Sequence, residues 1–69
     1  MELSKEQKLL VSYFKNLEMS ENLIIATMLA VKEKEKMNKL IDYILEATDK
    51  GEKLDKDKIV KRALEISQE

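Results

Sequence analysis

The longest apolar run in the chain is Leu23-Ile24-Ile25-Ala26-Thr27-Met28-Leu29-Ala30-Val31, nine residues of which only Thr27 is polar. At about 100° of rotation per residue, its apolar side chains cover nearly the whole circumference of a helix. A helix that is apolar on every side has to be buried on every side. A bilayer-spanning helix takes about 20 residues, so this run predicts a buried helix that needs neighbours, in the same chain or in a partner.

Two serines mark the starts of the first two predicted helices. Ser20 is a good N-cap for a helix over about 20–32. Ser4 and Gln7 have the spacing of a capping box, which predicts a helix over about 4–17. The apolar residues of this first helix, other than Val11, fall on one stripe formed by Leu9, Leu10, Tyr13, Phe14 and Leu17.

Two signals locate the start of the last predicted helix: the end of the preceding helix and an N-cap residue. Gly51 follows Lys50 and suits the left-handed position that often ends a helix. Asp55 is an N-cap for a helix over about 55–67. Its apolar residues other than Ile66 form a narrow stripe of Ile59, Val60, Ala63 and Leu64.

Residues 20–50 contain neither Gly nor Pro, so no strong helix breaker divides them. Two apolar stripes in this segment face opposite directions, and residues 32–36 between them are all Lys or Glu. The second stripe consists of Met37, Leu40, Ile41, Ile44 and Leu45. We therefore predict a break near 32–37, which gives helices over about 20–32 and 34–50. The alternative is one continuous helix whose two faces pack on different neighbours, which would favour an intertwined dimer.

The whole chain is 69 residues, shorter than a typical domain, and we expect a single helical domain over 1–69. Strong helix formers dominate, and there is one Gly and no Pro. We predict an all-α fold, a compact bundle of three or four short helices. A chain of this size buries only about 60% of the surface that its unfolded form exposes, so a partner would add substantially to its small core.

The composition lacks most of the residue types that active sites use. There is no His to serve as a base and no Cys to serve as a nucleophile or metal ligand. One Gly cannot form a phosphate-binding loop. Residues 49–57 resemble a calcium loop only superficially, because Gly51 is third rather than sixth from Asp49. We predict no catalytic residue, no metal and no cofactor.

Charges of both signs are spread evenly along the chain, 13 basic against 14 acidic, for a net charge of −1. Such a balance creates no field that would attract nucleic acid, so we do not expect a nucleic-acid partner. The alternative function is a small DNA-binding transcriptional regulator that uses the cations of one of the last two helices. These cations are Lys34, Lys36 and Lys39 in the helix over 34–50, and Lys56, Lys58, Lys61 and Arg62 in the helix over 55–67.

The first residues do not form a basic segment followed by an apolar stretch, so we expect no signal peptide, no membrane partner and a cytoplasmic location. The function that the sequence favours is a non-enzymatic protein-interaction module. We expect its partner to be a second copy, forming a homodimer, or another helical protein. The predicted contact surface lies on the helix over 20–32 and consists of Ile24, Ile25, Met28, Leu29 and Val31.

Overall fold

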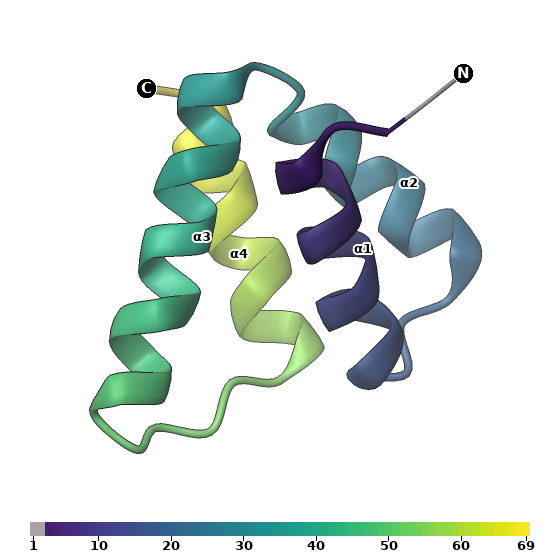
Figure 1. Cartoon of the computed structure of the whole chain (residues 1–69). Coiled ribbons are helices and arrows are strands. Elements are labelled where there is room, and N and C mark those ends of the chain that lie inside the picture. The colour runs from purple at the N-terminus through teal and green to yellow at the C-terminus, as the bar shows by residue number, and fades with distance from the viewer. Residues whose placement is uncertain (1–2) are drawn as a thin grey trace.

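Four α-helices and their short connections make up residues 3–69, the part of the chain that the computed structural model describes. The helices are α1 (Lys5–Asn16), α2 (Glu21–Ala30), α3 (Lys34–Asp49) and α4 (Lys56–Ser67). Figure 1 shows them as two antiparallel hairpins, α1 with α2 and α3 with α4. The hairpins pack together through α1 on α3 and α2 on α4. The predicted all-α bundle is confirmed.

The boundary between α2 and α3 lies where the sequence predicted it. Residues 31–33 separate the two helices, and Val31 is fully buried at the bend. Glu33 is the N-cap of α3, but its side chain accepts no capping hydrogen bond. An unbroken helix over 20–50 would be about 46 Å long, whereas the longest dimension of the molecule is 35 Å. Burial of both apolar stripes in one small core therefore requires the bend.

The predicted caps form in the other three helices. Ser4 accepts from the Gln7 backbone N–H at 3.2 Å, and the Gln7 side chain accepts from the Ser4 N–H at 2.7 Å, which completes the capping box. Ser20 caps α2 by accepting from Leu23 N–H at 3.2 Å. Asp55 accepts from the Lys58 N–H at 2.9 Å at the start of α4. Local sequence signals thus determine three of the four helix starts.

The core draws side chains from all four helices and from the bends between them. Its buried apolar residues are Leu10, Phe14, Met19, Ile24, Val31, Met37, Leu40, Ile44, Ile59, Ala63 and Ile66. Thr27 is buried within α2, and its hydroxyl donates to the Leu23 carbonyl at 2.8 Å. The interior of the described chain therefore holds no side-chain N or O atom that lacks a hydrogen-bond partner.

The apolar stripe predicted for the last helix differs from the buried face that α4 has in the structure. Ile66 is completely buried, although it lay off the predicted stripe, and Leu64 is 53% exposed. Ile59, Ala63 and Ile66 are spaced by four and three residues, which places them on one face of a helix. In α1 and α3, likewise, Leu9 and Leu45 belong to the predicted stripes but lie on the surface.

α1 ends in a left-handed turn that the sequence does not signal. Among the described residues, Glu18 is the only non-glycine with a positive φ, at 60°. Its N–H donates to the Lys15 carbonyl at 3.0 Å, and the Met19 N–H donates to the Phe14 carbonyl at 3.2 Å. This pair of hydrogen bonds is the Schellman motif, in which the left-handed position usually belongs to glycine.

α3 ends in the same motif, with the glycine that the sequence predicts. Gly51 has a φ of 74°, and its N–H donates to the Thr48 carbonyl at 3.0 Å. The Glu52 N–H donates to the Ala47 carbonyl at 2.8 Å. The two hairpins are therefore closed by the same hydrogen-bonding pattern but by different residue types.

Candidate functional site

An open groove of about 550 Å³ runs between α1 and α2. We call it the α1/α2 groove. On the α1 side it is lined by Leu3, Gln7, Val11 and Lys15, and on the α2 side by Glu21, Ile24, Ile25, Met28, Leu29 and Lys32. Its middle is apolar, and charged side chains lie at its ends.

Helical spacing explains why these residues share a groove. Gln7, Val11 and Lys15 recur every four residues along α1 and so lie on one face. On α2, Ile25 and Leu29 are likewise one turn apart. Because the two helices run antiparallel in Figure 1, the Lys15 end of α1 lies beside the start of α2.

The structure divides the five residues predicted as a contact surface. Ile25 is 52% exposed and Leu29 is 65% exposed, while Met28 is half-buried beside them. Ile24 is buried and forms the floor of the α1/α2 groove. Val31 is fully buried and lies outside the groove, because the chain bends into the core at the end of α2. Three of the five therefore offer surface to a partner.

Two groove residues were not part of the predicted surface. Leu3, which is 45% exposed, precedes the first helix and so has no helical pattern around it. Val11 lies off the core stripe of α1, which is why it faces the groove instead. The available signal for Val11 was an apolar residue beside the core stripe rather than on it.

Two smaller apolar hollows lie elsewhere on the molecule. One, of about 190 Å³, lies between α1 and α3, where Leu9 and Leu45 are more than half exposed. The other, of about 70 Å³, lies between α2 and α4, beside Leu64. The α1/α2 groove is larger than both, and it alone of the three has charged residues in its lining.

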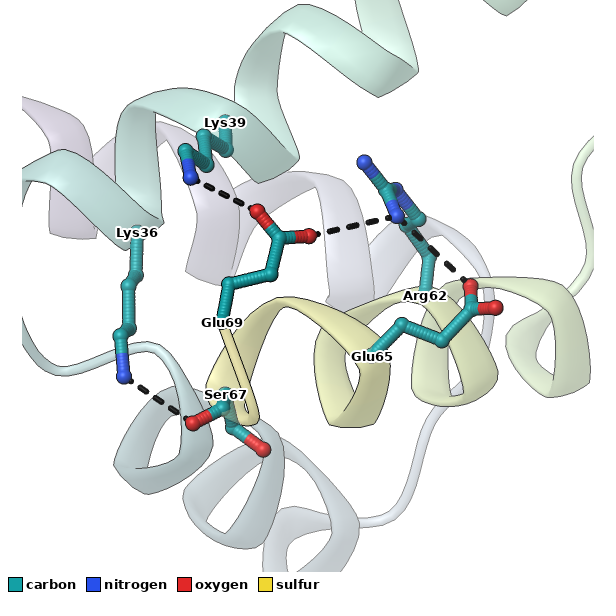
Figure 2. A network of polar contacts seen from close by, with 6 residues as sticks. All are labelled: Lys36, Lys39, Arg62, Glu65, Ser67 and Glu69. Carbon is teal, nitrogen blue, oxygen red and sulfur yellow. Dashed lines mark hydrogen bonds and ion pairs between the residues drawn. The ribbon is translucent and has the colours of Figure 1, made fainter.

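The opposite side of the bundle carries a polar network between α3 and the end of α4, which Figure 2 shows from close by. Lys39 Nζ lies 2.7 Å from a Glu69 carboxylate oxygen, and Arg62 lies 3.7 Å from the other oxygen. The Arg62 guanidinium also stands over the ring of Tyr43, 5.9 Å from its centroid. The hydrogen bond from Lys39 is the main cause that lowers the pKa of Glu69 from its ordinary value of 4.5.

This network involves several of the cations named above as candidate DNA contacts. Besides Lys39 and Arg62, Lys36 donates from Nζ to the Ser67 carbonyl at 3.0 Å. Arg62 also lies 3.8 Å from Glu65 on its own helix. On this face the positive charges are thus held among oxygen acceptors of the same chain.

The described residues contain no cluster of three or more acidic side chains placed to hold a metal ion. Within residues 3–69, no helix has both the length and the apolar character needed to cross a membrane.

No protein-family model matches the sequence, and comparison with curated proteins and with solved structures finds no significant match.

Proposed function

We propose that this protein is a small, non-enzymatic helical interaction module whose contact surface is the α1/α2 groove. The observation that carries the proposal is the position of Ile25 and Leu29, which lie one turn apart on α2 and are both more than half exposed. Large apolar side chains scattered singly over a surface are ordinary. Here they adjoin Leu3, Met28 and the buried Ile24 along one groove, and such contiguous apolar surface is typical of a protein contact.

The energetics favour a partner that brings apolar surface of its own. Full burial of one aliphatic side chain stabilises by about 1.5–3 kcal/mol, so covering the exposed parts of Leu3, Ile25 and Leu29 gains about 2.5–5 kcal/mol. Association costs about 4–15 kcal/mol. A partner with an equivalent apolar face would double the gain to about 5–10 kcal/mol. A helical protein surface meets this requirement, and the expected affinity is weak.

The DNA-binding regulator remains the second candidate, and the polar network counts against it. Lys36, Lys39 and Arg62 would have to exchange their present oxygen acceptors for phosphates. A titration with mixed-sequence duplex DNA at low salt tests this function. A phosphate-binding protein would bind with an affinity that falls steeply as salt is added, and we expect no binding.

Site-specific photo-crosslinking in cells that produce the protein tests the interaction module directly. A photoreactive phenylalanine derivative replaces Leu29 in the α1/α2 groove or, as the matched control, the similarly exposed Leu64 on α4. We expect a discrete protein adduct from position 29 and none from position 64. No adduct from position 29, or equal yields from both positions, would contradict the proposal.

A further inference from the structure

The stripe of α2 that lines the α1/α2 groove runs from an acid to a base. Glu21 is the first residue of the helix, Ile25 and Leu29 follow at successive turns, and Lys32 lies just beyond the end. Both charged side chains are exposed, and neither forms an ion pair with another of the residues 3–69. The stripe is thus apolar in the middle, negative at one end and positive at the other.

A stripe with this order is complementary to its own antiparallel copy. When Ile25 of one copy lies opposite Leu29 of the second, Leu29 of the first lies opposite Ile25 of the second. In the same register, Glu21 lies beside the end of α2 of the second copy, just beyond which Lys32 of that copy lines the groove. Two-fold symmetry repeats this ion pair at the other end. One register therefore satisfies the apolar and the charged residues together.

We infer that the α1/α2 groove is occupied by a second copy of this chain, with α2 antiparallel to α2 of that copy. The inference rests on the proposed function, because it names the partner of the same groove. In this arrangement α1 lies over α1 of the second copy, which brings Lys15 near Leu3 and Gln7 rather than near another cation.

The other two-fold arrangement of the same groove places α2 over α1 of the second copy. Glu21 then faces Lys15, but Ile25 and Leu29 face Gln7 and Val11. The more exposed apolar residues then meet an amide-bearing side chain, and covering a polar group without a matching hydrogen bond opposes association. The α2-to-α2 arrangement avoids this and is the one that we assign.

The expected dimer belongs to the smallest class of specific interfaces. Such interfaces bury about 600 Å² of each partner, which is little more than a tenth of the 5198 Å² surface of this chain. Dimers of this size dissociate at micromolar to millimolar concentrations. Association therefore has to be measured over about 10 µM to 1 mM, by sedimentation equilibrium at low salt.

The test is a charge-reversal cycle on the full chain, with Glu21→Lys, Lys32→Glu and the double variant. Each single change puts like charges together at both ends of the dimer, and we expect it to weaken association about tenfold. The double variant restores opposite charges, and we expect its affinity to return to within about twofold of the original. Glu52→Lys and Lys53→Glu, in the exposed α3–α4 connection, repeat the same charge changes away from the groove and should leave association unchanged.

The double variant also separates pairing between copies from effects within one copy. Glu21 lies in the first turn of α2 and interacts favourably with the positive end of the helix dipole, and both Glu21→Lys and the double variant lose this interaction. Damage to α2 alone would therefore be at least as great in the double variant as in Glu21→Lys. Only contacts between copies predict that adding the second charge reversal restores the dimer affinity that the first one lowers. Circular dichroism is the control that each variant keeps its helices.

Three results would overturn the inference. A chain that stays monomeric at about 1 mM would reject the dimer. If position 29 then gave an adduct with a different protein, the proposed interaction module would still hold, with another partner. Single reversals without effect, or a double variant that is not restored, would reject the register. Restoration of Glu21→Lys by Lys15→Glu instead would assign the groove to the α2-over-α1 arrangement.

Discussion

The two hairpins of this bundle share a fold and differ in what they present to solvent. The α1–α2 hairpin has an apolar groove with Ile25 and Leu29 exposed, while the α3–α4 hairpin has charged side chains in mutual contact around Glu69. Yet α2 is the most apolar helix of the four and contributes only Ile24 and Thr27 to the interior. The difference shows that the core of a bundle can leave much of its most apolar helix exposed, and this exposed part is the surface that we propose for a partner.

The largest expected difference is in the free energy of unfolding, between two leucine-to-alanine variants, one in each hairpin. Leu40 on α3 is fully buried, and Leu40→Ala should lower the free energy of unfolding by about 2–5 kcal/mol through lost burial and a cavity. Leu29 on α2 is 65% exposed, and Leu29→Ala should change it by less than about 1 kcal/mol while weakening association. Urea unfolding at low protein concentration measures both, and equal losses would contradict the contrast between the hairpins.

An intermediate effect should follow from exchanging residue types between the two Schellman turns. A left-handed conformation costs a non-glycine residue about 1–2 kcal/mol, and the greater freedom of glycine in the unfolded chain offsets part of this. Glu18→Gly should therefore stabilise by about 0.5–1 kcal/mol. Gly51→Ala should destabilise by about the same amount through backbone strain alone, since an added Cβ would meet nothing within 4 Å.

Thermal unfolding of these two single variants and of the double variant checks the comparison. The two turns share no hydrogen bond, so their effects should add, and the double variant should unfold near the temperature of the original chain. Changes of the same sign in both single variants would show that the two turns are not equivalent.

The smallest effect should come from the polar network of the α3–α4 hairpin. A carboxyl whose pKa is lowered in the folded state stabilises the fold when ionised and stops doing so as the pH falls through that pKa. Glu69→Gln should thus lower the unfolding temperature slightly at neutral pH. The difference should shrink below pH 4.5 and vanish once Glu69 is protonated in the folded chain. Because the ion pair with Lys39 is exposed, added salt should also reduce this difference in unfolding temperature.

Local signals in the sequence predicted the helices well, because each depends on a few neighbouring residues. Ser4, Ser20, Asp55 and Gly51 cap the helices in which they were placed, and the change of stripe direction correctly located the bend between α2 and α3. Glu18 was missed because its left-handed position usually belongs to glycine, and nothing in its residue type signals that conformation.

Burial was harder to predict where a helix carries two overlapping apolar stripes. In α4, Ile66 is completely buried and Leu64 is 53% exposed, although Leu64 and not Ile66 lay on the stripe predicted from the sequence. The groove has the same origin. Met28 and Leu29 were expected at a contact surface, but Leu3 and Val11 join them only because α1 lies alongside α2. Residues that become neighbours through tertiary packing leave no local pattern.

Val31 has a consequence for how the chain reaches its native fold. No Gly, Pro or side-chain cap divides residues 20–50, so local preferences alone would permit one straight rod. The bend is held by burial of Val31, which exists only after the helices have come together. The angle between α2 and α3 is therefore set by tertiary packing around Val31 rather than by a local helix breaker.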